Sequence, residues 1–387
     1  MLRVLTLSTL FPDATRPNFG GFVERQTLAL ARRDDVQVTV AAPVGLPPWP
    51  LSRHPRYAAL AGLPAREEWR GLEVWRPCFL NLPGTGGRFH AAALARALAP
   101  LLRHLSFDVI DAEYFFPDGP AAVALGRRLG LPVSIKARGS DVHHWGNLPV
   151  TAGQVRAAGL AADGLLAVSA AMRDDMIALG MPATSIHVHR TGVDPCFAAQ
   201  DRAAARAASG IAGPLVLSVG ALVAGKGHDV LIDAMAALPG VSLLIAGEGP
   251  ERAALAGRIA GHGLGERVRL IGAVPHAHMP ALHAAADVMA LASHAEGLAN
   301  AWVEALATGT PVVTTDVGGA RELVTPACGR LVARTPEAFA AAIRELIAHP
   351  PAPGTVRAAV ADYSWETNAT ALAAHLRGLV EARARSR

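Results

Sequence analysis

Residues 288–314 read VMALASHAEGLANAWVEALATGTPVVT, and they decide the fold of the second half of the chain. The apolar run at 288–291 predicts a buried strand, a loop follows it, and a helix is expected to begin near Asn300. The apolar run at 312–314 predicts the next strand. Alternation of short apolar strands with helices is typical of a parallel sheet that is covered on both faces.

The same stretch places polar groups where a phosphate can bind. A helix that begins at Asn300 offers free backbone N–H groups and the positive end of its dipole, which suit a diphosphate. Gly297 lets the backbone approach a ligand closely. Glu296 can meet a sugar hydroxyl, and Glu304, one turn into the helix, can accept hydrogen bonds from ribose. On spacing alone, a solvated Glu296 and a Glu304 paired with an arginine explain these residues equally well.

Strand-like segments alternate with helix-like segments along the whole chain. Helical spacing is clear at 22–33, 89–104 and 118–129. Strands are expected at 3–8, 36–41, 72–76, 107–111, 132–136, 164–168, 186–189, 215–219, 241–246, 268–271, 288–291 and 312–314. The alternation restarts after a polar, Ala-, Gly- and Pro-containing stretch at 194–213, which predicts two α/β domains in series.

The predicted fold class is therefore α/β, with two Rossmann-like, doubly wound domains facing each other across a cleft. We expect the N-terminal domain at 1–195 and the C-terminal domain at 196–363, followed by a helix at 364–387. Ligands of open parallel sheets bind beyond the carboxyl ends of the strands, and clefts between domains are preferred ligand sites. Functional residues are therefore expected just after the strands.

Composition restricts the classes of protein to consider. Of the 387 residues 51% are hydrophobic and 18% charged, which is typical of an ordered globular protein. The net charge of +4 is small and spread out, so no nucleic acid partner is expected. Cys78, Cys196 and Cys328 lack the spacing of metal ligands or of a disulfide framework. No run of about 20 apolar residues is present, and residues 1–11 read as a strand, so a cytoplasmic location is expected.

Further motifs extend the pattern beyond residues 288–314. Glu296 and Glu304 are separated by seven residues, A-x-x-x-G-x-P-V-V follows, and Gly318-Gly319 precede Glu322. In this order and spacing the chain resembles retaining glycosyltransferases of family four, which have the GT-B fold. The resemblance covers most of the chain through Gly20-Gly21, Arg138-Gly139-Ser140-Asp141, Val219-Gly220, Lys226-Gly227, Gly247-Glu248-Gly249-Pro250 and Ser364-Trp365-Glu366. It implies that the helix at 364–387 returns to complete the N-terminal domain.

The resemblance also implies a role for each matching position in binding a nucleoside diphosphate sugar. Lys226 would neutralise the diphosphate, Glu296 would contact the donor sugar, and Glu304 would hold the ribose. Arg138 is a further catalytic candidate. The other donor-binding positions would act through their backbone: Gly20 and Gly21 at the phosphates, Ala273 and Val274 at the base, and Leu298, Ala299 and Asn300 at the sugar or phosphate.

Two positions depart from the pattern of the family. Ala221 stands where an arginine commonly follows the glycine, so one phosphate-binding cation is missing or is supplied by another residue. Arg138 stands where many members carry a histidine before the glycine. We expect Arg138 to compensate for Ala221 by placing its charge near the diphosphate.

Polar residues after the strand at 132–136 form a second candidate cluster. Asp141, His143 and His144 are candidates for acid–base work or for binding the acceptor, with surface residues of no role as the alternative. Asp174 and Asp175 are expected to form a solvated helix face.

Other classes of protein share parts of this pattern. Residues 220–227 match the phosphate-binding loop of NTPases except at Gly227, which replaces the Ser or Thr that binds Mg²⁺. Gly247 and Gly249 begin a dinucleotide fingerprint, but Arg252 occupies its third glycine position. No D-x-D triplet is present, so metal-chelated diphosphate chemistry is not expected. A nucleotide-sugar epimerase and a non-catalytic nucleotide-sugar-binding relative remain open.

The function expected from the sequence is transfer of a sugar from a nucleoside diphosphate sugar to an acceptor with retained configuration, without a cofactor or metal. Saccharide or lipid-linked acceptors of cell-surface polysaccharide or glycolipid synthesis fit this family. The arginines within residues 377–387 predict weak association with anionic lipid at the inner face of the membrane. An ordinary solvated tail explains the same arginines equally well.

Overall fold

The computed structural model describes residues 1–103, 105–198 and 200–386, and the chain divides into two compact units. Unit 1 comprises Met1–Gly192 together with Trp365–Arg387, and unit 2 comprises Val193–Ser364. The boundary from unit 1 to unit 2 lies between residues 192 and 193, three residues before the domain boundary expected between 195 and 196. The Val193 N–H donates to the Tyr363 carbonyl oxygen at 3.0 Å, which ties residue 193 to the end of unit 2.

Unit 1 is built on an eight-stranded sheet in the order β10-β9-β8-β7-β1-β2-β5-β4. All neighbouring strands are parallel except β4 and β5. The order grows outward from β1 on both sides, which is the doubly wound arrangement. The strands are β1 Leu2–Leu7, β2 Val36–Ala41, β4 Arg66–Trp69, β5 Leu72–Trp75, β7 Val109–Ala112, β8 Val133–Ala137, β9 Gly164–Ala167 and β10 Ile186–Val188, with β3 Val44–Leu46 and β6 Cys78–Leu80 forming a separate pair.

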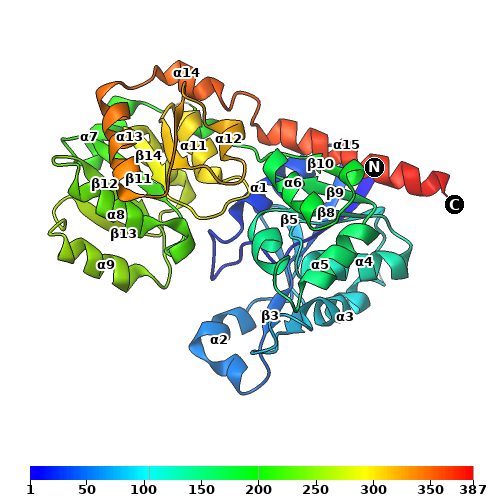
Figure 1. The fold of residues 1–387 in the computed structure, drawn as a ribbon. Helices are drawn as coiled ribbons and strands as arrows, with labels where there is room; N and C mark the ends of the chain where they lie inside the picture. Colours follow the sequence, from blue (N-terminus) through cyan, green and yellow to red (C-terminus); the bar gives the residue numbers. More distant parts are fainter. Residues whose placement is uncertain (104, 199, 387) are drawn as a thin grey trace. The chain divides into compact units, whose positions relative to one another are not determined.

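Helices follow most strands of unit 1, and α15 joins them from the far end of the sequence (Figure 1). The helices are α1 Gly21–Ala31, α2 Pro55–Ala61, α3 His90–Leu102, α4 Asp118–Leu129, α5 Ala152–Ala161, α6 Ala170–Ala178 and α15 Trp365–Arg385, with short turns at η1 Leu51–Arg53, η2 Asp141–Trp145 and η3 Ala183–Ser185. Leu372 and Leu376 of α15 are fully buried in one cluster with Leu30 of α1 and Val4 of β1. The C-terminal helix is therefore part of the core of unit 1.

Unit 2 has a six-stranded parallel sheet in the order β13-β12-β11-β14-β15-β16. Its strands are β11 Leu215–Val219, β12 Ser242–Ala246, β13 Val268–Gly272, β14 Val288–Leu291, β15 Val312–Thr315 and β16 Gly329–Val332. Its helices are α7 Arg202–Ser209, α8 His228–Ala236, α9 Arg252–Gly261, α10 Met279–Ala285, α11 Asn300–Thr308, α12 Ala320–Leu323, α13 Pro336–Ala348 and α14 Pro353–Ala358, with η4 Pro195–Phe197, η5 Ala224–Lys226 and η6 His276–His278.

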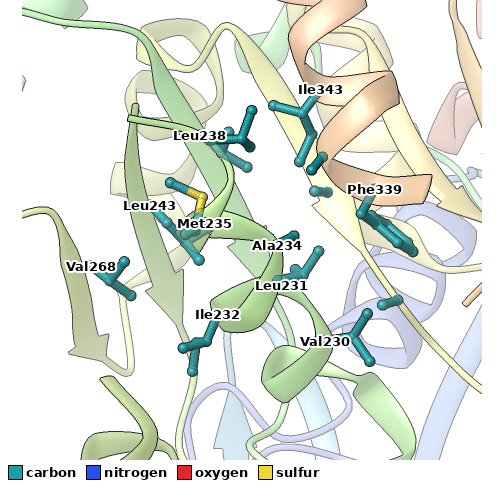
Figure 2. Packing of buried hydrophobic residues seen from close by; sticks show 14 of the residues in the cluster. Val230, Leu231, Ile232, Ala234, Met235, Leu238, Leu243, Val268, Phe339 and Ile343 are labelled. Atoms are coloured by element: carbon teal, nitrogen blue, oxygen red, sulfur yellow. The ribbon is translucent and has the colours of Figure 1, made fainter. Parts of the chain in front are cut away.

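One hydrophobic core of unit 2 lies between α8, α13 and the sheet (Figure 2), and a second, smaller cluster joins α7 and α10 to β11 and β12. Leu231 and Ile232 of α8 are buried in one cluster with Leu243 of β12 and with Phe339 and Ile343 of α13. Helices on the sheet surface remove its apolar side chains from water, which explains why the strands read as short, continuous apolar runs. The expected α/β architecture with two parallel sheets is confirmed.

Four strands were not expected from the sequence, namely β3, β4, β6 and β16. Each has only three or four residues. The sequence of β4, Arg-Glu-Glu-Trp, is polar because this strand lies at the edge of the sheet and none of its residues is fully buried. Among the helices of the described ranges, none is long and apolar enough to cross a membrane.

Candidate functional site

An ion pair joins the loops that follow β11 and β14, which are neighbouring strands of unit 2. Lys226 Nζ lies 2.5 Å from Glu296 Oε1, and the Ser293 hydroxyl donates to the same oxygen at 2.6 Å. The Glu296 side chain is 10% exposed and the Lys226 side chain 28%. The carboxylate is thus held by two donors, while the lysine side chain remains partly exposed.

Backbone contacts fix the turn that carries Lys226. The His294 N–H donates to the Gly225 carbonyl oxygen at 2.7 Å, and the Arg334 side chain bridges this turn to the end of β14 by donating to the carbonyl oxygens of Ala224 at 3.2 Å and Ala292 at 2.8 Å. Gly227 has φ 67°, and a Cβ added there would lie 2.1 Å from the Ala292 oxygen. A Ser or Thr at position 227 is therefore excluded, which rules out the hydroxyl that an NTPase loop needs at this place.

Helix α11 begins at Asn300, as the sequence predicted. Its N-cap residue is Ala299, and no side chain caps the first turn. Leu298 and Ala299 are buried at 9% and 8% exposure, and the Gly319 N–H donates to the Gly297 carbonyl oxygen at 2.9 Å. The helix start is thus held in place without a side-chain cap, which suits binding of an anionic group by its first amides.

Glu304 of α11 lies between two histidines, His276 of η6 and His283 of α10. His276 Nε2 lies 3.5 Å from Glu304 Oε1, and His283 Nε2 lies 3.7 Å from Glu304 Oε2. Burial raises the pKa of the Glu304 carboxyl, but the two histidines outweigh burial and hold its pKa at about 2. The carboxylate is therefore ionised, and its side chain is still 13% exposed. Its neighbours are histidines and not the arginine that the alternative interpretation required.

The loop expected to hold the base leads directly into this cluster. Ala273 and Val274 follow β13, Ala273 is exposed, and Val274 is half-buried. His276, two residues after Val274, begins η6, and its Nε2 lies 3.5 Å from Glu304 Oε1. The positions proposed for base and ribose are thus adjacent in unit 2.

In unit 1, Gly20 and Gly21 differ in what their backbone requires. Gly20 caps α1 with φ 67°, and a Cβ there would lie 1.8 Å from the Leu10 carbonyl oxygen. A Cβ at Gly21 would approach only Arg25, at 3.6 Å. Local packing therefore explains Gly20 fully, whereas Gly21 leaves the N-terminus of α1 open.

Arg138 follows β8 and pairs with Glu113, which follows β7. The exposed fractions of the two side chains are 6% and 0%. Arg138 Nε also donates to the Glu113 carbonyl oxygen at 3.1 Å, and the guanidinium lies 4.9 Å from the ring centre of Phe22. The Arg138 charge is thus already balanced inside unit 1. From the sequence we instead expected this charge near the diphosphate, as compensation for Ala221.

A buried polar network continues below this pair. Lys136 Nζ donates to Gln26 Oε1 at 2.6 Å and lies 2.7 Å from His189 Nδ1. Burial, with the nearby Arg138 charge, lowers the pKa of Lys136 to about 7, and burial lowers the pKa of His189 to about 3. His189 is therefore neutral, so Nδ1 accepts from Lys136 and Nε2–H donates to the Asn368 carbonyl oxygen of α15 at 2.9 Å.

Asp141 serves the backbone around it. The carboxylate is fully buried and accepts from the N–H groups of Phe115 at 2.8 Å, Gly139 at 2.7 Å and Arg138 at 3.0 Å. It therefore joins the loops that follow β7 and β8. This contact set is that of a structural residue, although acceptor binding was also expected of it.

The two histidines beside Asp141 have different surroundings. His143 Nε2 lies 2.8 Å from Asp175 Oδ2, and the Asp175 side chain is 46% exposed, so Asp175 lies on a solvated face, as expected, and also pairs with His143. His144 is exposed and lies edge-on to Trp145, with ring centres 5.1 Å apart. His143 with Asp175 is the half-buried polar pair of this loop.

Sequence reasoning missed three residues of unit 2 that touch the candidate site. Ser293 lies in the motif of residues 288–314, and its position at the end of β14 could have identified it. His276 directly follows the expected base loop. His283 gives no signal, because a histidine on an apolar helix is usually part of the core.

The arginines of α15 have acidic neighbours. Arg377 lies 2.5 Å from Asp35, Arg383 lies 3.4 Å from Asp163, and Arg385 lies 3.9 Å from Glu381. Their charge is thus partly balanced by unit 1 itself, and Arg387 lies outside the described residues. Within the described ranges, no three His, Cys, Asp or Glu side chains gather as a metal site would require.

Two mostly parallel sheets with charged residues after their strands are common to many enzyme families, and the comparison with family models identifies which family this chain belongs to. Residues 22–196 match the model of Glycosyltransferase Family 4, and residues 201–362 match that of Glycosyl transferases group 1. The chain belongs to this glycosyltransferase family and has the GT-B fold, as its sequence motifs indicated.

Relatives and solved structures agree with this assignment. The GDP-mannose-dependent alpha-(1-6)-phosphatidylinositol monomannoside mannosyltransferase of Mycolicibacterium smegmatis is 31% identical over 298 residues, which are 71% of this chain and 78% of the relative. Sucrose-phosphate synthase of Thermosynechococcus elongatus has a TM-score of 0.81 at 20% identity, covering 99% of this chain and 100% of that one. Anabaena HepE in complex with UDP and glucose has a TM-score of 0.76 at 22% identity, covering 97% and 100%. These matches do not favour an epimerase or a non-catalytic relative.

Proposed function

We propose that this glycosyltransferase moves a sugar from a nucleoside diphosphate sugar to an acceptor with retention, and that unit 2 holds the donor. The observation that carries the proposal is the Lys226–Glu296 pair beside the uncapped start of α11. One cation and a set of free amides together match a diphosphate, while the carboxylate matches sugar hydroxyls.

The reaction barrier is departure of the nucleoside diphosphate while positive charge grows on the sugar ring. Lys226, with 28% of its side chain exposed, can turn one N–H toward the diphosphate while Glu296, itself held by the Ser293 hydroxyl, keeps the lysine in position. Charge placed in advance at the leaving group stabilises the transition state more than the ground state. Glu296 accepts from a donor-sugar hydroxyl in this scheme, and neither a cofactor nor a metal is assigned a role.

The nucleoside is assigned to the neighbouring part of unit 2. Glu304 accepts from the ribose hydroxyls, because it is ionised at neutral pH and keeps partial access to solvent. The backbone of Ala273 and Val274 contacts the base. Leu298, Ala299 and Asn300 offer amides to the sugar or phosphate. Gly21 is proposed to offer its open amide from unit 1, with Gly20 shaping the turn.

For the acceptor, we propose a saccharide or a lipid-linked sugar bound by unit 1. The M. smegmatis relative is a phosphatidylinositol monomannoside mannosyltransferase, which supports a lipid-linked acceptor and a place in glycolipid or polysaccharide synthesis. His143, held by Asp175, is the acceptor-binding candidate, and Arg138 is assigned to positioning the loop that carries it. A cytoplasmic reaction at the inner face of the membrane is part of this proposal.

The test is a panel of UDP, GDP and ADP in calorimetry with the wild type and Lys226→Ala. One of the three nucleotides should bind, and the variant should lose roughly tenfold or more in affinity, since a hydrogen bond to a charged group contributes about 1.5–3 kcal/mol. Proton NMR of the product formed from the matching nucleotide sugar should show the donor's anomeric configuration. Absence of binding by all three nucleotides, or an inverted product, would contradict the proposal.

A further inference from the structure

A pocket lies between α3 and α4 of unit 1, on helices that the proposed donor and acceptor sites do not use. It has a volume of about 380 Å³, and three arginines, Arg96, Arg103 and Arg128, line it. Ala99, Pro100 and Ala124 form part of its wall. Small side chains on both helices thus leave space between them, and the long arginines border that space.

The three arginines of this α3–α4 pocket have no acidic partner among the residues that the structure describes. The sequence contains no Asp or Glu from residue 74 to 107, nor from 119 to 140. The arginines of α15, by contrast, each lie within 4 Å of a carboxylate at Asp35, Asp163 or Glu381. Three like charges gathered at one pocket repel each other, so an anion bound among them would be stabilised.

The helix dipole accounts for only part of this arrangement. Arg103 is the C-cap of α3, and Arg128 lies in the last turn of α4, where cations are favourable. Arg96 lies in the middle of α3, where the helix dipole does not stabilise a cation, and it borders the same pocket. The three side chains are exposed, and helix capping accounts for two of them but not for the position of Arg96 at the pocket.

The pocket is also separate from the charged residues at the candidate site. Arg103 and Arg128 end the helices that lead into β7 and β8, so they lie toward the amino ends of these strands. Glu113 and Arg138 follow the carboxyl ends of the same strands. A ligand in the pocket is thus at the opposite end of these strands from the loop that carries Arg138 and His143.

We propose that the α3–α4 pocket is a second anion site, which binds a phosphate-bearing group. Guanidinium groups bind phosphate oxygens through paired N–H donors, and several arginines can surround one phosphate. A volume of about 380 Å³ is in the range of small-molecule sites and admits a phosphate with an attached organic group. The headgroup of an anionic phospholipid and a soluble phosphate compound share this chemistry.

The experiment compares Arg96→Gln, Arg128→Gln and the double variant with Arg127→Gln in the full chain. Arg127 is the matched control, because it is exposed, neighbours Arg128 on α4 and does not line the pocket. Each variant is titrated with inorganic pyrophosphate in calorimetry and is co-sedimented with vesicles of phosphatidylglycerol or of phosphatidylcholine. Lys226→Ala is titrated in parallel, so that pyrophosphate bound at the donor site is recognised.

Each pocket arginine should contribute about fivefold in apparent affinity, since a basic residue near an anionic surface contributes about 1 kcal/mol. Arg127→Gln should stay within about twofold of the wild type. Loss of pyrophosphate binding identifies a soluble ligand, and loss of phosphatidylglycerol binding identifies a lipid headgroup; either result supports the site. Equal loss in Arg127→Gln, or no change in either arm for the double variant, would overturn it. Activity on a soluble acceptor should be retained in every pocket variant.

Discussion

Each unit carries an ion pair between a basic residue and a glutamate just after neighbouring strands, yet the two pairs differ in access to solvent. Lys226 and Glu296 of unit 2 have side chains that are 28% and 10% exposed. Arg138 and Glu113 of unit 1 are 6% and 0% exposed. Both ion pairs follow neighbouring strands, but the pair in unit 2 is partly exposed to solvent and the pair in unit 1 is buried.

The difference follows from the neighbours of each glutamate. Glu296 is alone with Lys226 and Ser293, so the lysine can be shared with a ligand. Glu113 lies in a buried group with Asp111, whose pKa burial and Glu113 raise well above its usual value. Arg138 and Lys136 are needed there to balance buried acid groups. A cation after a strand is thus available to substrate only where the protein does not already need it.

The largest expected effect concerns stability. Arg138→Met should lower the free energy of unfolding of unit 1 by about 3–5 kcal/mol, because it leaves the buried Glu113 without its partner. Lys226→Met should change stability by less than about 1 kcal/mol, since that pair is partly solvated. Thermal unfolding monitored by calorimetry separates the two cases. Equal shifts in the two variants would show that the pairs do not differ as described.

The next effect concerns activity. Lys226→Ala should reduce kcat by roughly 10²–10³, the loss typical when one preorganised donor to a developing charge is removed. Combining it with Arg138→Ala should give the sum of the two effects in free energy, because the residues contact different carboxylates. Steady-state kinetics on the four proteins tests this. Strong non-additivity would instead place both cations on one diphosphate.

Glu304→Ala should weaken binding of the cognate nucleoside diphosphate by about 1.5–3 kcal/mol, through lost hydrogen bonds to the ribose. His283→Ala should weaken it less, since His283 acts only through the carboxylate that it faces. The matching 2′,3′-dideoxynucleotide is the control, because it lacks the hydroxyls. Loss of affinity for that nucleotide as well would mean that Glu304 acts on another part of the ligand.

The smallest effect is a pH dependence of unit 1. The pKa of His189 is about 3 in the folded chain, below the ordinary value of about 6.5 in the unfolded chain. The unfolded chain therefore takes up a proton first, and stability is lost as the pH falls from about 6.5 toward 3. Between about pH 6.5 and 4.5 the loss should be roughly 1–3 kcal/mol. His189→Gln should show a flatter unfolding curve over this range; an unchanged slope would contradict the assignment.

The sequence predicted the sheets well where strands are apolar and central. Residues 215–219 and 288–291 were expected as strands and are β11 and β14, with the same bounds. The strands β4 and β16 were not predicted, because these edge strands bury few side chains and so lack an apolar run. Apolar periodicity reports burial, and it fails where a strand is paired but not covered.

The candidate site was predictable in its residues but not in its contacts. The motif around Glu296 identified the loop, yet its lysine partner lies 70 positions away in the sequence. The charge balance of Arg138 was not foreseen, because Glu113 gave no motif of its own. Pairing between side chains depends on strand order in the sheet, which local patterns do not contain.

The position of α15 has a consequence for synthesis on the ribosome. This helix buries Leu372 and Leu376 in unit 1, but all of unit 2 is translated before it. Domains generally fold as units during synthesis, and the N-terminal one is usually first. Here the nascent unit 1 exposes the apolar surface of α1 and β1 until α15 emerges, whereas unit 2 is continuous in sequence and can fold earlier. Unit 2 is thus expected to complete its folding before unit 1, which reverses the usual order.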